Sequence, residues 1–335
     1  MTKLSENYEI ASSRKSTRFA HDPTIYEHPV ELLQNLIRFD TTNPPGNEAE
    51  CIKYINTLLT DVGFETVVLF KDINRPNVIA RLKGQGATAP ILLHGHVDVV
   101  TTAYQKWTHP PFEAEIADGY IWGRGALDMK SGVAMMLAAF LRAKAEHLNP
   151  SGDIVLAIVS DEEAGGNYGA KFLVENHQGY FEGIRYAIGE LGGFSLYSRK
   201  KNFYPIMVSE EQICQMKTII RGFGGHGSIP MYGGSMAKVD RLLRQLDTKT
   251  LGLFNLLSEI LREADPRGKP LLLLMPTITD ARFFSRLGIH TYGFIPTKLP
   301  PNLNFLHTIH GEDERIPIES VAFGAEAIYK VLQRF

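Results

Sequence analysis

The stretch that decides the fold is Ile154-Val155-Leu156-Ala157-Ile158-Val159-Ser160-Asp161-Glu162-Glu163, six apolar residues followed by a serine and three carboxylates. A strand that is apolar at every position has both faces covered, as in the centre of an α/β sheet. Open α/β sheets bind ligands at the carboxyl ends of their strands. This stretch therefore predicts a central strand that ends in a functional site.

Strand-like and helix-like segments alternate around this central strand. Strands are expected at 65–70, 77–82, 91–94, 153–159, 187–189 and 288–294. Helices are expected at 29–37, 48–62, 129–146, 168–175, 253–264 and 320–333. This alternation of two hydrophobic periods is typical of the α/β class.

The pattern changes between residues 201 and 250. Here a strand at 214–220, a glycine-rich loop at 222–230 and a helix at 235–246 are expected, which together indicate an inserted subdomain. The rest of the chain divides into a polar N-terminal arm, residues 1–27, and a main domain made of 28–200 and 251–335.

Composition narrows the class of protein. The chain has 335 residues, of which 44% are hydrophobic, and its 35 basic and 37 acidic residues leave a net charge of −2. With no extended run of one sign, we expect neither nucleic acid nor a membrane as partner, but a small-molecule or short-peptide substrate. No segment has the composition of a secretory signal or a membrane span, which predicts a cytoplasmic location. Cys51 and Cys214 are expected to be reduced core thiols.

A histidine-rich segment follows the expected strand at 91–94: Leu92-Leu93-His94-Gly95-His96-Val97-Asp98-Val99-Val100. Residues two apart in an extended chain point the same way, so His96 and Asp98 share a face. A metal-bound histidine usually has its second ring nitrogen held by a carboxylate. The spacing favours His96 as a metal ligand and Asp98 as the residue that orients it, although a pair of surface histidines would look the same.

Four further acidic or histidine-containing segments have the same ambiguity. Asp128 follows a glycine-rich turn at a helix start, where an aspartate is often only a cap. Three adjacent carboxylates at 161–163 repel one another unless a cation or solvent is present. Glu190 ends another strand and His310 lies in a polar segment near the C-terminus. Together these residues form a mixed nitrogen and oxygen set suited to zinc, with cobalt or manganese as substitutes.

Seven short motifs occur in a fixed order: His-Gly-His-x-Asp-x-Val, Gly-Arg-Gly-x-x-Asp-Met-Lys, Asp-Glu-Glu, Gly-Glu, Gly-Gly-His-x-Ser-x-Pro, Thr-Asp-Ala-Arg and His-x-x-Asp-Glu-Arg. From about residue 28 to the end, the chain resembles the zinc exopeptidase and deacylase family of acetylornithine deacetylase, succinyl-diaminopimelate desuccinylase, aminoacylase and glutamate carboxypeptidase. The resemblance implies a phosphorylase/hydrolase-like mixed sheet with helices on both faces and an α+β lid insertion.

The resemblance also assigns roles to residues. It implies two zinc ions held by five ligands: His96, Asp128, Glu163, Glu190 and His310. Asp128 would bridge the two ions, and the peptide bond that follows it would be cis. Glu162 would be the general base in the hydrolysis of an amide bond, peptide or N-acyl amino acid, next to a carboxylate.

Three further residues are expected to contact the substrate. The resemblance implies that His226, in the loop 224–230, stabilises the oxyanion and reaches across from a partner subunit. Arg282 and Gly293 are expected to hold the substrate carboxylate and to line its pocket. A flexible surface loop and a structural ion pair of Arg282 are the alternatives, because glycine-rich loops and arginine–carboxylate pairs are common without such roles.

The insertion at 201–250 is shorter than the family lid, and residues 248–252 look like the join of an internal deletion. This shortening argues against the homodimer that is typical of the family. Two functions follow: an active amidohydrolase, or a metal-binding descendant that has lost turnover and serves as a binding or regulatory module. The intact Glu162 favours the enzyme, because a protein without turnover needs no base beside its metals.

Overall fold

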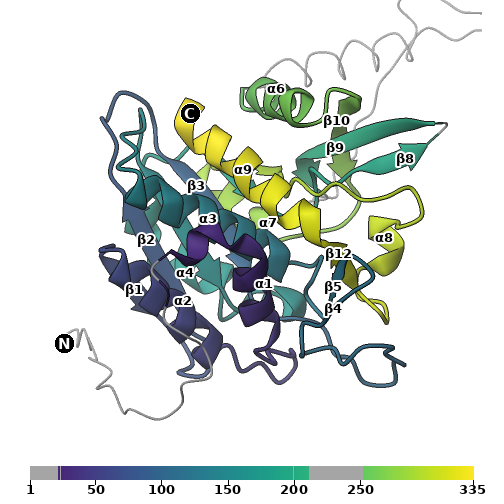
Figure 1. The fold of residues 1–335 in the computed structure, drawn as a ribbon. Helices are drawn as coiled ribbons and strands as arrows, with labels where there is room; N and C mark the ends of the chain where they lie inside the picture. Colours follow the sequence, from purple (N-terminus) through teal and green to yellow (C-terminus); the bar gives the residue numbers. More distant parts are fainter. Residues whose placement is uncertain (1–21, 23, 199, 211–251) are drawn as a thin grey trace, which may run out of the picture.

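The computed structural model describes residues 22, 24–198, 200–210 and 252–335, and its largest feature is a nine-stranded sheet. The strands are β1 (Thr66–Leu69), β2 (Asn77–Leu82), β3 (Ile91–His96), β6 (Ile154–Val159), β7 (Tyr186–Gly189), β8 (Leu196–Ser198), β9 (Lys201–Glu210), β10 (Gly268–Met275) and β11 (His290–Gly293). Their order is β1-β2-β6-β3-β7-β11-β9-β10, and β8 pairs with β9 (Figure 1).

The centre of this sheet is parallel. β6, β3, β7 and β11 run in the same direction, whereas β1, β2, β8 and β9 supply antiparallel pairings. The sheet is therefore mixed, which confirms the predicted fold class. Because the four central strands are parallel, their carboxyl ends meet at one edge, and the chain leaving each strand there is brought together.

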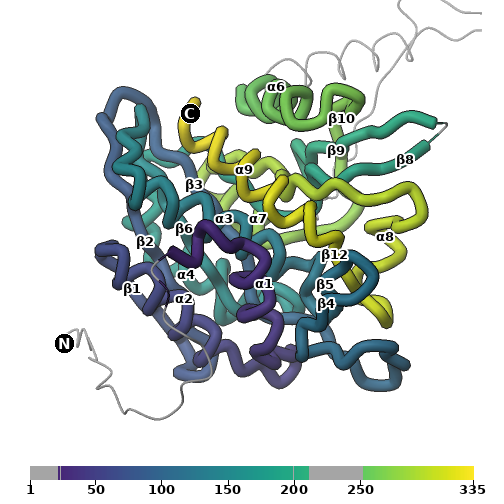
Figure 2. Tube along the Cα trace, in the orientation of Figure 1, coloured from purple at the N-terminus to yellow at the C-terminus, as the bar shows by residue number. Residues whose placement is uncertain are grey.

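Helices cover both faces of the sheet. On one face pack α1 (Pro29–Ile37), α2 (Ala49–Asp61), α3 (Lys130–Ala145), α6 (Phe254–Ala264) and α9 (Ile318–Arg334). On the other pack the shorter α4 (Ala170–Asn176) and α7 (Ala281–Phe284). Figures 1 and 2 show α1, α3 and α9 side by side in front of the sheet.

The central strand shows why the sequence folds this way. All six residues of β6 are buried, and they alternate between the two hydrophobic cores. Leu156 packs beneath the long helices, whereas Val155 and Ala157 pack against α4 and α7. Because successive side chains of a strand point to opposite faces, an apolar residue at every position is what a two-sided core requires.

A second, three-stranded sheet joins distant parts of the chain. It consists of β4 (Ile116–Ala117), β5 (Tyr120–Trp122) and β12 (Arg315–Pro317), in the order β12-β5-β4. β12 pairs antiparallel with β5, so that Arg315 lies opposite Trp122. This pairing places the segment after α8 (Phe305–Thr308) next to the glycine-rich turn that precedes α3.

The predicted insertion lies mostly outside the described residues. This holds for the expected strand at 214–220, the loop at 222–230 and the helix at 235–246. Residues 201–210 are described, and they form β9, which is hydrogen-bonded within the main sheet to β8, β10 and β11. The sequence did not predict β10, the edge strand beside β9. The division of the chain into a main domain and a lid stays a prediction.

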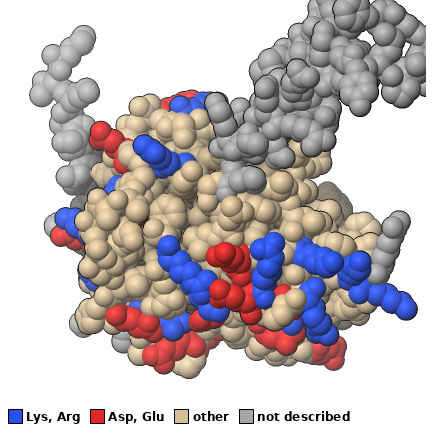
Figure 3. Space-filling view, turned by 90° about the horizontal axis from the view of Figure 1, so that it is seen from above, with Lys and Arg blue, Asp and Glu red and all other residues tan. Residues whose placement is uncertain are grey.

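The cysteines, the helices and the charged surface bear on the remaining sequence predictions. Cys51 is fully buried and free, as predicted, whereas Cys214 is outside the described residues. In the described part of the chain, every helix is too short or too polar to span a bilayer. Acidic and basic side chains lie next to one another on the face in Figure 3.

Candidate metal centre

The five predicted metal ligands come from five separate segments. They are His96 at the end of β3, Asp128 before α3, Glu163 in the single turn η2 (Glu162–Ala164) after β6, Glu190 after β7, and His310 between α8 and β12. Three of these residues, His96, Glu163 and Glu190, lie at the carboxyl ends of the neighbouring parallel strands β3, β6 and β7. The topology therefore collects side chains that are far apart in the sequence.

The ligand atoms form two groups that share Asp128. The His96 Nε2 atom lies 3.5 Å from Oδ1 of Asp128 and 3.4 Å from Oε2 of Glu190. The His310 Nε2 atom lies 3.1 Å from Oδ2 of Asp128 and 3.2 Å from Oε1 of Glu163. Each Asp128 oxygen thus faces a different histidine, which is the arrangement that a bridging carboxylate requires. The peptide bond between Asp128 and Met129 is cis, as the resemblance implied.

These spacings fit a bound divalent cation. Zinc binds nitrogen and oxygen at about 2.0–2.1 Å with tetrahedral geometry, so two of its ligand atoms lie about 3.3–3.4 Å apart. Among the described residues, His96 Nε2 and Glu163 Oε1 are buried side-chain atoms that make no hydrogen bond of regular geometry, although each faces another candidate ligand at 3.2–3.5 Å. Such atoms are rare in folded proteins. A cation at each group would receive the lone pairs that are otherwise unused.

The orientation of His96 is set by Asp98. The His96 Nδ1 atom lies 3.0 Å from the backbone carbonyl oxygen of Asp98 and 3.3 Å from its carboxylate Oδ1. Both are acceptors, so Nδ1 carries the hydrogen in the neutral ring and Nε2 presents its lone pair to the metal position. The predicted orienting residue is therefore in place, and its backbone contributes along with its side chain.

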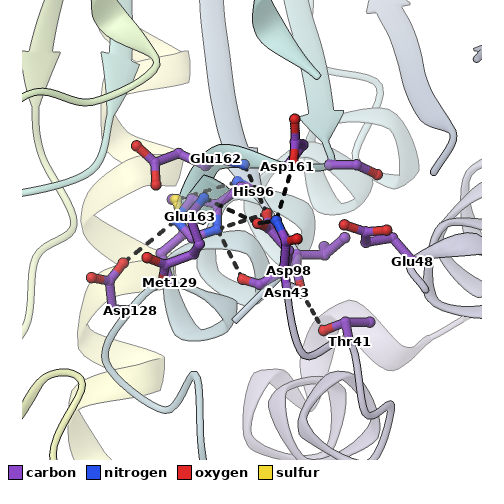
Figure 4. A network of polar contacts seen from close by, with 12 residues as sticks. Thr41, Asn43, Glu48, His96, Asp98, Asp128, Met129, Asp161, Glu162 and Glu163 are labelled. Atoms are coloured by element: carbon purple, nitrogen blue, oxygen red, sulfur yellow. Dashed lines mark hydrogen bonds and ion pairs between the residues drawn. The ribbon is translucent and has the colours of Figure 1, made fainter. Parts of the chain in front are cut away.

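The carboxylate of Asp98 also holds the turn that carries two of the acidic residues (Figure 4). Its Oδ1 accepts the backbone N–H of Glu162 at 3.1 Å, and its Oδ2 accepts that of Glu163 at 3.0 Å. Asn43 donates to the same Oδ2 at 2.8 Å. Burial opposes ionisation, but the hydrogen bonds from His96 and Asn43 outweigh it and lower the pKa of Asp98. This carboxylate therefore stays charged.

Asp161 belongs to a separate buried ion pair rather than to the metal groups. The Arg75 guanidinium donates to Glu48 through Nε at 3.1 Å and Nη2 at 2.7 Å, and its Nη1 lies 2.9 Å from Asp161 Oδ1. Asp161 Oδ2 accepts the backbone N–H of Tyr168 at 3.0 Å. One of the three crowded carboxylates is thus neutralised by Arg75, which no motif in the sequence had singled out.

Glu162 lies beside the first metal group, next to His96 and Glu190. One of its carboxylate oxygens is within 4.8 Å of ligand atoms of both His96 and Glu190. Burial, followed by the nearby negative charge of Glu190, raises the pKa of Glu162 well above its usual value. A carboxylate that binds protons readily next to a metal position has the property required of a general base.

The pKa values of other ionisable groups in and beside the site also depart from their usual values. Hydrogen bonds to Asp128 and Glu163 raise the pKa of His310 to about 10. Burial raises the pKa of Glu190 to about 7, against the opposing hydrogen bond to His96. The neighbouring His94 is not part of either group. It is buried against Phe284, and burial lowers its pKa to about 3, which leaves its ring neutral.

The three residues predicted to contact the substrate are placed differently. Arg282 lies in α7, with its guanidinium carbon 4.6 Å from the centroid of the Phe283 ring. Gly293 ends β11, where a Cβ atom would collide with the carbonyl oxygen of Glu190, so this glycine permits close packing behind a metal ligand. His226 lies outside the described residues. The substrate roles of all three stay predictions.

Similarity to known proteins identifies the family of this chain. The sequence profile of Peptidase family M20/M25/M40 matches residues 92–334, which is more than half of the 335 residues. The chain belongs to this family. The matched region contains all five candidate ligands. The predicted recognition and the predicted class, a metal-dependent hydrolase, are confirmed at the level of the family.

Curated relatives of this M20 chain include succinyl-diaminopimelate desuccinylases. The protein from Paracoccus denitrificans (strain Pd 1222) is 38% identical over 148 residues, which cover 44% of this chain and 38% of the relative. The protein from Wolbachia pipientis wMel is also 38% identical over 148 residues, covering 44% of this chain and 36% of the relative. The similarity thus spans less than two fifths of the length of these relatives.

Solved structures agree on the fold of this M20 chain. Human carnosine dipeptidase 1 has a TM-score of 0.64 at 12% identity, covering 92% of this chain and 96% of that one. The M20 family metallo-carboxypeptidase Sso-CP2 from Sulfolobus solfataricus has a TM-score of 0.64 at 13% identity, covering 91% and 98%. At such low identity the similarity establishes a shared fold, and it confirms the α/β architecture.

Proposed function

We propose that this M20 family chain is a two-zinc amidohydrolase that cleaves a peptide or N-acyl amino acid bond next to a carboxylate. One observation carries the proposal: two histidine nitrogens, each 3.1–3.5 Å from two carboxylate oxygens, share the carboxylate of Asp128. One zinc ion would be held by His96 and Glu190, the other by Glu163 and His310. Cobalt or manganese would substitute, because the nitrogen and oxygen donors suit all three metals.

A bound metal pair supplies Lewis-acid polarisation of the scissile carbonyl and activation of water. The residues of this chain would do the rest. Glu162 would take the proton of the attacking water and return it to the nitrogen of the departing amine. Asp98 would keep His96 in the ligating tautomer and hold the backbone that carries Glu162, so that the base stays beside the reacting bond.

The substrate would be a small molecule or a short peptide. Desuccinylase, dipeptidase and carboxypeptidase, the names of the similar proteins, are names of enzymes that break an N-acyl or peptide bond. They support an amide substrate. Arg282 would bind the substrate carboxylate as a bidentate partner, Gly293 would border the pocket, and His226 would stabilise the oxyanion. We further propose a cytoplasmic enzyme with no nucleic-acid or membrane partner, in which the short insertion disfavours the family homodimer.

An amine-release screen tests this proposal. Protein stripped of metal by chelation is reloaded with Zn²⁺, Co²⁺ or Mn²⁺ and offered N-succinyl and N-acetyl amino acids and dipeptides. The expected result is free amine that appears only with added metal. If two metal ions bind and no substrate in the panel is cleaved, the chain would instead be the metal-binding module without turnover.

A further inference from the structure

A second buried ion pair, Arg124 with Glu314, lies behind the metal centre. The two residues are 190 positions apart, and both side chains are completely shielded from solvent. Nη1 of Arg124 donates to Oε2 of Glu314. Neither residue is one of the five candidate ligands, and the function proposed above gives neither of them a role.

Glu314 binds the backbone of the turn that carries Asp128. Its free Oε1 accepts the N–H of Leu127 at 2.7 Å and the N–H of Asp128 itself at 3.1 Å. The backbone carbonyl of Glu314 also accepts the N–H of Gly123 at 2.9 Å. Glu314 is thus hydrogen-bonded to both the start and the end of the glycine-rich turn that leads to Asp128, the candidate ligand shared by the two groups.

Arg124 binds the backbone of the segment that carries His310. Its Nη2 donates to the carbonyl oxygen of His310 at 3.2 Å and to that of Gly311 at 3.0 Å. The same nitrogen donates to Oε1 of Gln105 at 2.8 Å, and Nε2 of Gln105 donates back to the carbonyl of His310 at 2.8 Å. The guanidinium also lies over the ring of Trp107, 5.3 Å from its centroid.

The backbone of His310 needs such support. His310 has φ +60, a left-handed conformation that residues other than glycine adopt infrequently. A residue keeps this conformation when its surroundings hold it there. The hydrogen bonds from Arg124 and Gln105 to the carbonyl of His310 are two such contacts.

We propose that Arg124 and Glu314 form a positioning pair that sets the distance between Asp128 and His310 before any ion binds. The pair joins the N–H of one candidate ligand to the carbonyl of the other, and the side-chain atoms of the two ligands are 3.1 Å apart. This inference rests on the proposed metal centre. It adds that Arg124 and Glu314, which are not ligands themselves, position two of the five candidate ligands.

A fully buried ion pair is a poor device for stability alone. Removing two charges from water is costly, and apolar residues of similar volume often stabilise a fold as well or better. Four backbone groups of the two ligand segments depend on this pair. Geometry therefore explains the pair better than stability does, and the two explanations can be separated by experiment.

The decisive variant is Arg124→Met combined with Glu314→Leu. It removes both charges together, so no unpaired charge stays buried, and it replaces them with apolar groups of similar size. The readout is titration of metal-free protein with Co²⁺, followed by visible absorption, which reports coordination without any substrate. The wild-type protein should bind two equivalents. In the double variant, the affinity for one of the two Co²⁺ equivalents should fall about 10- to 100-fold. A loss of this size is typical when residues that support metal ligands are removed.

The control is Tyr204→Phe combined with Asp265→Asn. This pair is also buried and hydrogen-bonded, with 2.9 Å between Oη of Tyr204 and Oδ2 of Asp265, and it contacts none of the candidate ligands. Both Co²⁺ equivalents should bind it as tightly as they bind the wild type. A second variant, Glu314→Asp, retains the charge but withdraws the carboxylate, and it should weaken the same equivalent even if the double variant does not fold.

The outcomes distinguish the two proposals. If wild-type protein binds a pair of Co²⁺ ions and Glu314→Asp or the folded double variant binds them equally well, the positioning pair is overturned while the proposed function stands. Equal weakening of both equivalents in the variants and in the control would also overturn it, because the effect would then be general destabilisation. A wild-type protein that binds fewer than two ions would count against the proposed function itself.

Discussion

The carboxylate of Asp98 accepts the backbone N–H groups of two consecutive residues, including that of Glu163 at 3.0 Å. A residue expected only to orient His96 therefore also fixes the turn that carries the candidate ligand Glu163 and the proposed general base Glu162. This double contact links the segment after β3 to the turn after β6, beyond the last paired residues His96 and Val159 of the two strands.

Replacing Asp98 by asparagine should separate its two roles, the orientation of His96 and the support of the turn that carries Glu162 and Glu163. The amide group of asparagine can replace only one of the two acceptor oxygens, and its N–H₂ would face a donor from Glu163 or Asn43. We expect metal affinity to fall about 10- to 100-fold. Isothermal titration with Zn²⁺ measures this. Unchanged affinity would mean that the backbone carbonyl of Asp98, which the variant retains, is sufficient to orient His96.

Glu162→Gln should abolish turnover and leave metal binding intact. The amide cannot take a proton from water, and general-base catalysis typically contributes about 10²–10⁴-fold. We expect kcat to fall by about that factor while two metal ions still bind. Glu175→Gln is the matched control, because Glu175 is an exposed partner of Arg286 on the surface. A Glu162→Gln enzyme with wild-type kcat would remove Glu162 from the mechanism.

Metal binding should release protons at neutral pH. Hydrogen bonds to Asp128 and Glu163 raise the pKa of His310 to about 10, so the ion-free protein holds this proton at pH 7. A metal ion needs the neutral ring and must displace the proton. Affinity should therefore rise with pH up to about 10. Titration calorimetry in buffers with different ionisation enthalpies counts the protons, and a count of zero at pH 7 would contradict the assignment of His310 as a ligand.

Gly293→Ala should destabilise the fold. The added Cβ would lie 2.7 Å from Cβ of Met207 and would collide with the carbonyl oxygen of Glu190. Overpacking of this kind costs about 1–3 kcal/mol. Urea denaturation of the two proteins measures the difference. Gly179→Ala is the control, because no atom lies within 4 Å of the corresponding Cβ position. Equal stability of the two variants would show that the backbone around Gly293 yields to an added methyl group at little cost.

Local patterns predicted the elements whose hydrophobic period is complete. The strand at 77–82 was predicted with the bounds that β2 has, and the structure extends the strand at 91–94 to His96. β10 was not predicted, because its run of leucines follows Pro270 directly and is partly exposed. The short strands β4, β5 and β12 carry too few residues for a period to be recognised.

The candidate ligands and the orienting residue Asp98 were predictable, whereas the other residues that support them were not. Each ligand is a metal-binding residue type at the end of a recognisable element, and the family motifs fix their order. Asn43 and Arg75 reach the site from loops without such a pattern. Arg124 and Glu314 lie inside quoted motifs, yet their pairing across 190 positions depends on the contact between β5 and β12. Contacts of this range are properties of the tertiary structure.

Anomalous diffraction at the zinc edge, from crystals of metal-loaded protein, tests the central claim most directly. We expect two zinc peaks, one bonded to His96 and Glu190 and the other to Glu163 and His310, with Asp128 between them. Each metal–ligand distance should be about 2.0–2.2 Å. Peaks bonded to other residues, or a single peak that leaves one of the two histidines unbound, would contradict it.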